Sequence, residues 1–374
     1  MTAINRCRCW NVVGKNQLRM DTIQCDSPAS HEVRIRPTAC GICGSDVELL
    51  KKGGAHSAHA GAPQPITMGH ELVGIVEAIG HDVTSHKIGD VVAIEPGIPC
   101  EKCNACKVGF YHCCPNTKYM GTPPVNGGMA DYFNWPAKWA HHLPAQLKAD
   151  HVLAASVEPV ACCFQAVDHR NRLAQHVSDE LWTAITGGGM MALATATILK
   201  RINPREKVAV MVRSKEDRDF ALSIGVDKVV MLSKSAMGSP EWVTETEAAF
   251  KELKDSTGGM VSSVIECTGS NPLLEALIKA QCVLAGGSII GLGCHYGISI
   301  DVAHLRRHEL AFQPIRRSAH QFPKTLNLMA QEPNVFRSLI GGTVKFEDFG
   351  TFMGGDTSVA TVVNAGAPKT IIVM

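Results

Sequence analysis

The sequence predicts an α/β protein with two domains, one rich in β-strands and one built on a doubly wound parallel sheet. Its 374 residues are too many for one hydrophobic core. Residues 1–157 are rich in Gly, Pro and His and contain short β-like runs, whereas apolar strands alternate with helical patterns from Glu158 onward. Alternation of this kind produces a parallel sheet that is covered by helices on both faces.

The first domain is expected to be compact and mostly β, with long loops. Short runs such as Glu32–Arg36 and Leu72–Val76 are bounded by turn residues, as strands in such a domain are. After about Ala311 the pattern becomes mixed again. Residues 312–374 are therefore expected to return to the first domain.

The second domain is expected over residues 158–311. Its strands are predicted at Leu181–Thr186, Val208–Val212, Lys228–Leu232, Ser263–Glu266 and Gly287–Leu292. The polar stretch Ser235–Lys254 predicts a surface helix together with its loop.

Composition restricts the classes of partner and the compartment. The chain carries 36 Lys+Arg and 35 Asp+Glu, a net charge of +1, so neither a nucleic-acid nor a membrane partner is expected. The N-terminus lacks the apolar segment of a secretory signal, and apolar runs are interrupted well before the ~18 residues that a membrane span needs. The chain contains 15 Cys, which in a cytoplasmic protein indicates metal ligands and buried thiols more than disulfides.

Four cysteines follow the spacing of a structural zinc site. Cys100, Cys103, Cys106 and Cys114 form a C-x2-C-x2-C-x7-C array. Thiolates at this spacing can converge on one tetrahedral Zn²⁺ within a single loop, and four closed ligands leave no position for substrate. The alternative is a Cys-rich loop without metal, and Cys113 is interpreted as a bystander thiol.

A second set of ligand types suits a catalytic zinc. Gly69-His70-Glu71 opens a G-H-E-x2-G-x5-G-x2-V pattern, and Cys43 lies upstream in Gly41-Ile42-Cys43-Gly44-Ser45-Asp46. A thiolate, an imidazole and a carboxylate from separated segments match a site with three protein ligands and one open position. Taken alone, His70 would be interpreted as an ordinary structural histidine.

A glycine-rich turn follows the first strand of the second domain. Gly187, Gly189 and Ala192 match the G-x-G-x-x-A form of the dinucleotide-binding fingerprint, and an apolar helical run, Leu193–Leu199, comes next. The first Gly forms the tight turn, the second admits a pyrophosphate, and the Ala permits close packing of the helix. The alternative is a plain turn, since glycine triplets are common.

The G-H-E signature, the G-I-C-G-S-D segment and the cysteine quartet together resemble the zinc-containing medium-chain dehydrogenase/reductase family, over nearly the whole chain. Thr122–Gly128, Ile265–Gly269 and Glu158 resemble its sorbitol and polyol dehydrogenase branch. The resemblance implies a GroES-like catalytic domain, a Rossmann domain between its two parts, and a homodimer or homotetramer.

The resemblance also implies roles at the catalytic zinc. Cys43 and His70 correspond to zinc ligands, and Glu71 to a ligand or a residue behind the ligands. Glu158 corresponds to the third protein ligand or to a hydrogen-bond partner of a zinc-bound water. Ser45 matches the hydroxyl that relays the substrate proton, but Glu48 stands where many members have the His of that route. Cys162 and Cys163, near Glu158, are interpreted as core thiols.

Cofactor choice is expected to favour NADP(H). In NAD-binding members an acid ends the second strand, whereas here Val212 holds that place and Arg213 and Ser214 follow. Arg213, assisted by Arg218, can pair with a 2′-phosphate. The alternative is that Arg213 is a solvated loop charge and that NAD binds. Thr268 and Leu292 correspond to residues that line the nicotinamide pocket.

The implied activity is hydride transfer between NADP(H) and a polyol or a secondary alcohol or ketone. Tyr119 and Arg317 correspond to substrate-contacting positions, although core packing and a surface charge would also explain them. Loops such as Lys51–Pro65 are expected to shape the pocket. The rivals are an NAD-dependent polyol, threonine or simple alcohol dehydrogenase of the same fold, and a catalytically silent nucleotide-binding relative. Zinc content separates the silent relative, because an enzyme of this kind holds two ions per chain.

Overall fold

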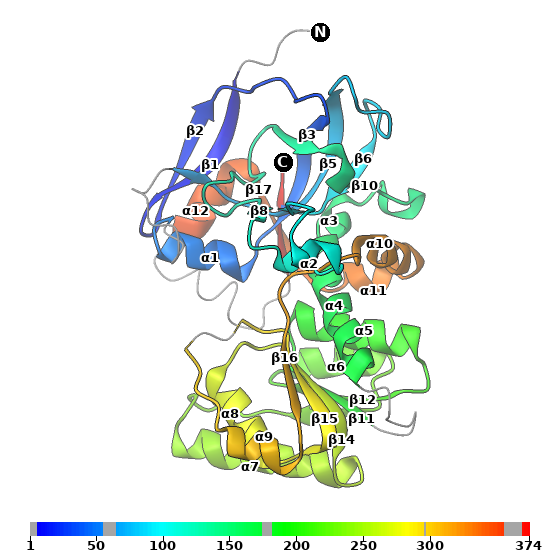
Figure 1. The fold of residues 1–374 in the computed structure, drawn as a ribbon. Coiled ribbons are helices and arrows are strands. Elements are labelled where there is room, and N and C mark those ends of the chain that lie inside the picture. Colours follow the sequence, from blue (N-terminus) through cyan, green and yellow to red (C-terminus); the bar gives the residue numbers. More distant parts are fainter. Residues whose placement is uncertain (1–5, 55–64, 174–181, 295–296, 355–368) are drawn as a thin grey trace. The chain divides into compact units, whose positions relative to one another are not determined.

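The computed structural model describes residues 6–54, 65–173, 182–294, 297–354 and 369–374 (Figure 1). The chain divides into two compact units. The first joins residues 1–159 to residues 319–374, and the second comprises residues 160–318.

The first unit is built around a seven-stranded, largely antiparallel sheet. The strand order is β10-β6-β5-β3-β18-β17, with β9 paired to β3. The strands are β3 (Glu32–Gly41), β5 (Glu71–Ile79), β6 (Val91–Ile94), β9 (Phe133–Pro136), β10 (Ala140–His142), β17 (Ile340–Lys345) and β18 (Lys369–Val373). Because β18 pairs antiparallel with β3, the C-terminal segment returns to the first domain, as the sequence predicts.

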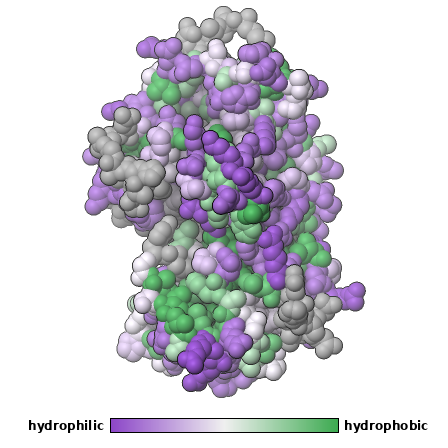
Figure 2. Space-filling view, viewed as in Figure 1, coloured by the Kyte–Doolittle hydropathy of each residue, from purple (hydrophilic) through white to green (hydrophobic). Residues whose placement is uncertain are grey.

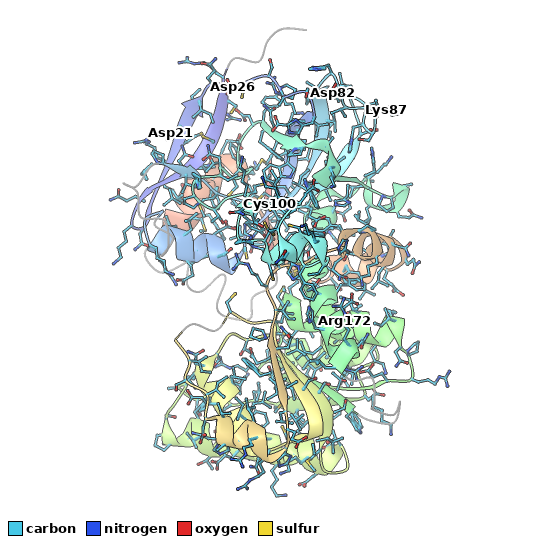
Figure 3. All side chains as sticks on the ribbon, viewed as in Figure 1. Asp21, Asp26, Asp82, Lys87, Cys100 and Arg172 are labelled. Carbon is cyan, nitrogen blue, oxygen red and sulfur yellow. The ribbon has the colours of Figure 1, made fainter. Side chains whose placement is uncertain are left out.

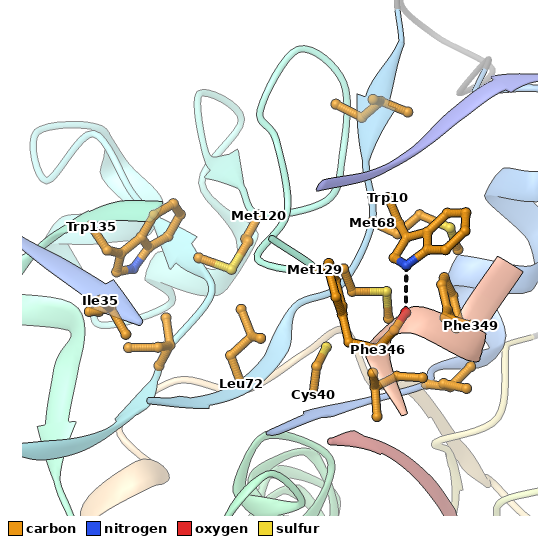
Figure 4. Close-up of a cluster of buried hydrophobic side chains, with 14 of the residues drawn as sticks. Trp10, Ile35, Cys40, Met68, Leu72, Met120, Met129, Trp135, Phe346 and Phe349 are labelled. Atoms are coloured by element: carbon orange, nitrogen blue, oxygen red, sulfur yellow. Dashed lines mark hydrogen bonds between the residues drawn. The ribbon is translucent and has the colours of Figure 1, made fainter. Parts of the chain in front are cut away.

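A second, smaller sheet and the C-terminal helices complete the core of this unit. The order is β2-β1-β4, formed by β1 (Cys7–Gly14), β2 (Gln17–Ile23) and β4 (Ile66–Thr67). Trp10 of β1 donates its indole N–H to the carbonyl oxygen of Phe346 at 2.7 Å and packs edge-on against Phe349 (Figure 4). These contacts join the two ends of the chain through one apolar cluster.

The second unit contains the predicted parallel sheet. Its order is β13-β12-β11-β14-β15-β16, and every pairing is parallel. The strands are β11 (Trp182–Thr186), β12 (Lys207–Val212), β13 (Lys228–Met231), β14 (Val261–Glu266), β15 (Val283–Gly291) and β16 (Ala311–Pro314). Its α/β class is therefore confirmed. The sequence-based boundary at residue 311 would cut β16, and this unit runs on to Ser318 because β16 pairs with β15.

Helices follow the strands of the second unit, as expected for a doubly wound sheet. They are α5 (Met190–Ile202), α6 (Lys215–Ser223), α7 (Pro240–Ser256), α8 (Asn271–Ala280) and α9 (Val302–Arg307). The polar stretch predicted as a surface helix contains α7, which begins after the Ser239 cap, with Pro240 at the first helical position. Apolar side chains gather on the surface of this unit near α8 and β16 (Figure 2). Among the described residues, no helix has the length and apolar character that a membrane crossing requires.

Candidate metal centres and cofactor site

The four cysteines of the predicted structural site converge in one lobe of the first unit. The lobe lies between β7 (Gly97–Ile98) and β8 (Lys118–Tyr119), which pair and bring its two ends together. One ligand atom from each of Cys100, Cys103, Cys106 and Cys114 lies within 4.8 Å of the others (Cys100 is labelled in Figure 3). The neighbouring Cys113 is exposed and is not a member of this group.

The sulfur separations fit a tetrahedral zinc ion. The Sγ atom of Cys103 lies 3.4 Å from that of Cys106 and 3.7 Å from that of Cys114. Four sulfurs at about 2.3 Å from a tetrahedral ion are about 3.8 Å apart. Backbone N–H groups of Lys102 and Cys103 lower the pKa of Cys100 to about 6, whereas burial and Cys103 raise the pKa of Cys106 to about 12. A divalent cation would stabilise all four as thiolates.

A buried polar network fixes this lobe to the sheet. The Tyr111 hydroxyl donates to Glu95 Oε1 at 2.6 Å, and His141 Nε2 lies 2.8 Å from Glu95 Oε2. The same hydroxyl accepts the backbone N–H of His320 at 2.8 Å. Glu95 is only 4% exposed, so these hydrogen bonds offset the burial of its carboxylate.

The second predicted group also assembles within the first unit. One ligand atom from each of Cys43, His70 and Glu71 lies within 4.8 Å of the other two. Cys43 caps the N-terminus of α1 (Gly44–Lys51), and Glu71 is the first residue of β5. His70 and Glu71 are buried, at 6% and 1% exposure.

Asp46 orients both Cys43 and His70, and sequence reasoning did not assign it a role. Its Oδ2 atom accepts the backbone N–H of Cys43 at 3.0 Å, and its Oδ1 atom lies 3.6 Å from His70 Nδ1. Burial alone would lower the pKa of His70, but Asp46 and Cys43 raise it by more. The signal in the sequence is the position of Asp46 three residues after the helix cap, as in a capping box.

Lys369 holds the carboxylate of Glu71. Its Nζ atom lies 2.6 Å from Oε1 and 2.5 Å from Oε2 of Glu71, and it donates to the carbonyl oxygen of Ile42 at 2.7 Å. Burial lowers the pKa of Lys369, but Glu71 and Cys43 raise it by more, so the amine stays charged. Lys369 begins an apolar strand far from the other site residues in sequence, and no local motif marks it.

Glu158 and Tyr119 form a pair beside this group. The Tyr119 hydroxyl donates to Glu158 Oε1 at 3.2 Å, and both residues are buried. Burial is the largest cause that raises the pKa of Glu158. His70 and Lys369 lower it, so Glu158 lies within their electrostatic reach, although it is not in the 4.8 Å group.

The donor set fits a dication. Three carboxylates, from Asp46, Glu71 and Glu158, are at least nine-tenths buried here beside the partly buried Cys43 thiol, and Lys369 supplies one positive charge. Buried charges are stable only when they are paired or coordinated. Zn²⁺ would supply the missing positive charge and accepts thiolate, imidazole and carboxylate ligands.

Ser45 and Glu48 both lie on α1 of the first unit. Ser45 is exposed in the first turn of α1, and its hydroxyl has no hydrogen bond within the described residues. Glu48 lies 3.5 Å from Lys51 and 3.8 Å from Lys52. Residues 55–64 of the expected pocket loop lie outside the described residues.

The predicted glycine turn lies between β11 and α5 of the second unit. Gly187 has a φ of 113°, and a β-carbon there would lie 3.3 Å from Thr268 Cγ2 and 3.5 Å from Ala192 Cβ. A β-carbon on Gly189 would meet nothing within 4 Å, so the turn is open in front of the N-terminus of α5. Helix N-termini with such an open face bind phosphate groups. Cys163 is buried and donates to the carbonyl oxygen of Met191 in the first turn of α5.

Glu266, at the end of β14, organises the neighbouring strand ends. Its carboxylate accepts the N–H of Thr268 at 2.7 Å and the Thr186 hydroxyl at 3.2 Å, and its backbone oxygen accepts the N–H of Leu292 at 2.8 Å. Thr268 and Leu292 are thereby held at the same edge of the sheet as the glycine turn. The predicted cofactor residues Gly187, Thr268 and Leu292 thus come together.

The residues predicted to select the cofactor have different surroundings. Val212 is fully buried at the end of β12, and Arg213 is exposed. The Ser214 hydroxyl accepts the N–H of Asp217 at 2.9 Å and caps α6. The Arg218 guanidinium donates to Asp219 at 2.9 Å, which directs it toward that exposed acid.

Arg317 follows β16 near the end of the second unit. It is half-buried, and its φ of 54° lies in the left-handed region. Its assignment as a substrate contact stays a prediction.

Comparison with known proteins decides the family. The family model described as alcohol dehydrogenase GroES-like domain matches residues 29–145, and the one described as zinc-binding dehydrogenase matches residues 189–331. The chain belongs to the zinc-containing medium-chain alcohol dehydrogenase family. It is an oxidoreductase, and the resemblance stated from the sequence motifs is confirmed.

Individual relatives place the chain near the polyol branch of this alcohol dehydrogenase family. It is 31% identical to a sorbitol dehydrogenase of Arabidopsis thaliana over 77% of this chain and 74% of that protein. It is 29% identical to a probable D-xylulose reductase A of Emericella nidulans over 85% of this chain and 84% of that protein. The fold matches that of a putative zinc-binding dehydrogenase from Sinorhizobium meliloti solved with NADP, with a TM-score of 0.80, 23% identity and 99% coverage of both chains.

Proposed function

We propose that this alcohol dehydrogenase oxidises a polyol, or reduces the corresponding ketone, with zinc and NADP(H). The observation that carries the proposal is the convergence of Cys43 with the buried His70 and Glu71 beside the Tyr119–Glu158 pair. The names of the sorbitol and xylulose relatives support a polyol as the substrate class.

Two groups absent from the chain itself supply the redox chemistry. Zinc, when bound by Cys43 and His70, polarises the oxygen of the substrate, and the nicotinamide accepts or returns the hydride. Cys100, Cys103, Cys106 and Cys114 would hold the second, structural ion of each chain.

The residues of the chain position the substrate and move its proton. Asp46 fixes the orientation of His70, and Lys369 holds one face of Glu71, so both side chains are kept in one arrangement. Glu158, with its pKa raised by burial, can accept a hydrogen bond or a proton near the substrate, and Tyr119 fixes its position. The exposed hydroxyl of Ser45 can pass the proton to solvent.

NADP(H) is proposed as the preferred cofactor. Val212 leaves the end of β12 without an acid, and Arg213 follows it on the surface. An Arg at this place attracts a 2′-phosphate, which an acid would repel.

We also propose that the protein acts in the cytoplasm as a homodimer or homotetramer. Support for assembly comes from β16, an edge strand of the parallel sheet, and from the apolar surface near it in Figure 2. The oligomeric state is measured by light scattering on the zinc-loaded protein.

The proposed activity is tested by initial rates of nicotinamide reduction. Sorbitol, xylitol, a secondary monoalcohol and a primary monoalcohol are each assayed with NADP⁺ and with NAD⁺. The proposal predicts faster turnover of polyols than of monoalcohols, with NADP⁺ ahead of NAD⁺, and no turnover by Cys43→Ala. Faster rates with NAD⁺ would reject the cofactor assignment alone, whereas equal rates for polyols and monoalcohols would reject the substrate class.

A further inference from the structure

An acidic residue closes one side of the glycine turn in the second unit. A β-carbon placed on Gly188 would overlap the carboxylate of Asp217 and lie 2.9 Å from its Cβ. Asp217 belongs to the first turn of α6, which packs beside α5 (Figure 1). The turn is thus open in front of Gly189 and bounded by a carboxylate beside Gly188.

Asp217 is fixed in place close to the turn. Its backbone N–H donates to the Ser214 cap at 2.9 Å, which sets the first turn of α6. Burial raises the pKa of Asp217, and Ser214 lowers it by less. Arg218, the adjacent cation on α6, pairs with Asp219 at 2.9 Å.

The sheet order shows which half of a dinucleotide Asp217 would meet. Strand β11 ends in the glycine turn, with β12 on one side and β14 on the other, and α6 follows β12. In dinucleotide-binding sheets the pyrophosphate lies at the turn, and residues after the second strand contact the ribose that carries the 2′ position. Asp217, on the β12 side, would face that ribose, and Thr268, on the β14 side, the other half.

We propose that Asp217 is a specificity-determining residue that accepts a hydrogen bond from the adenosine ribose hydroxyls of NAD(H) and opposes the 2′-phosphate of NADP(H). Asp217 and Arg213 then act in opposite directions, so the preference that Arg213 gives for the phosphorylated cofactor is limited. This inference rests on the proposed function, because it requires that the protein bind a nicotinamide dinucleotide. It does not require that NADP(H) be preferred over NAD(H).

Glu216 on the same helix provides a matched control for a purely structural role of Asp217. Acids in the first turn of a helix stabilise it through the helix dipole. Glu216 lies in the same turn of α6 and is exposed, so Glu216→Gln removes an equal charge away from the glycine turn. Asp217→Asn keeps the shape of the side chain and removes its charge.

The test measures binding without catalysis. Calorimetry gives Kd for ADP-ribose and for 2′-phospho-ADP-ribose with the zinc-loaded wild type, Asp217→Asn, Glu216→Gln and Arg213→Ala. Asp217→Asn is expected to tighten binding of the phosphorylated probe about tenfold, the scale of one relieved like-charge contact near a surface, and to weaken binding of ADP-ribose. Arg213→Ala should shift the ratio of the two Kd values the opposite way. Glu216→Gln should change the ratio less than about threefold, since exposed charges are screened.

An unchanged ratio in Asp217→Asn, or an equal loss for both probes with a lower thermal midpoint, would overturn the proposal in favour of a structural role. If the wild type prefers ADP-ribose, the NADP(H) assignment fails, while a ratio shift in Asp217→Asn still supports the role of Asp217. If the wild type binds neither probe, both the NADP(H) assignment and the role of Asp217 are overturned.

Discussion

Removing the hydroxyl of Tyr111 should destabilise the first unit without creating a cavity. Tyr111→Phe keeps the ring, whose centroid lies 5.2 Å from that of Trp139. It deletes the hydroxyl that donates to the buried Glu95 Oε1 at 2.6 Å. A hydrogen bond to a charged group contributes about 1.5–3 kcal/mol. The exposed N–H of His320 also loses its acceptor, but water can replace it, so the expected cost is about 2 kcal/mol.

This cost is large enough to measure by thermal unfolding. For a unit of this size, each kcal/mol lowers Tm by about 2–4 °C, which predicts a fall of about 6 °C. Tryptophan fluorescence is a direct readout, because Trp135 donates its indole N–H to the Glu95 carbonyl at 3.0 Å and Trp139 touches Tyr111.

Tyr132→Phe is the control. Within the described residues the Tyr132 hydroxyl makes no hydrogen bond, although its ring is half-buried in the same unit. Its removal should change Tm by less than about 1 °C. A Tyr111→Phe protein that unfolds within about 1 °C of the wild type, or no earlier than Tyr132→Phe, would refute the assignment of Tyr111 as the anchor of the cysteine lobe.

Three further predictions concern the metal groups. Lys369→Met leaves the buried Glu71 carboxylate without its cation and should lower the free energy of unfolding by about 3–5 kcal/mol, measured by urea unfolding of the metal-depleted protein. Adding Glu71→Gln should recover most of this stability, and no recovery would contradict the pairing of Lys369 with Glu71. Cys103→Ser should reduce zinc from two ions to one per chain by mass spectrometry, and two ions in the variant would contradict the quartet as a metal site. Tyr119→Phe removes the donor to Glu158 and should lower kcat/KM for the polyol about tenfold, whereas an unchanged kcat/KM would show that the pair does not serve the reaction.

Sequence reasoning is most successful where function depends on local spacing. The cysteine quartet, the G-H-E segment and the glycine turn each lie within a short stretch, and β7–β8 pairing or a strand–turn–helix unit fixes their geometry. The alternation of strands and helices likewise predicts the parallel sheet, because α5, α6 and α7 each pack on the strand that they follow.

The residues that sequence reasoning missed act across long sequence separations. Lys369 reaches Glu71 only because β18 joins the sheet beside β3, and no local sequence pattern predicts this pairing. Asp217 lies outside the family pattern at the end of β12, which concerns only Val212 and Arg213, whereas the glycine turn meets a residue one helical turn later. The boundary at residue 311 failed for a related reason, since β16 is short and only its pairing with β15 shows that it belongs to the sheet.

We infer that Cys43 and His70 hold the zinc ion on which polyol oxidation depends. The most direct measurement is the initial rate of NADP⁺ reduction by xylitol after removal of zinc with a chelator and after stepwise return of the metal. We predict that the rate is lost on depletion and returns with zinc in the wild type, but does not return in Cys43→Ala, whose cysteine quartet is intact. A rate that survives depletion, or a Cys43→Ala protein that turns over xylitol like the wild type, would show that polyol oxidation does not depend on a zinc ion at Cys43.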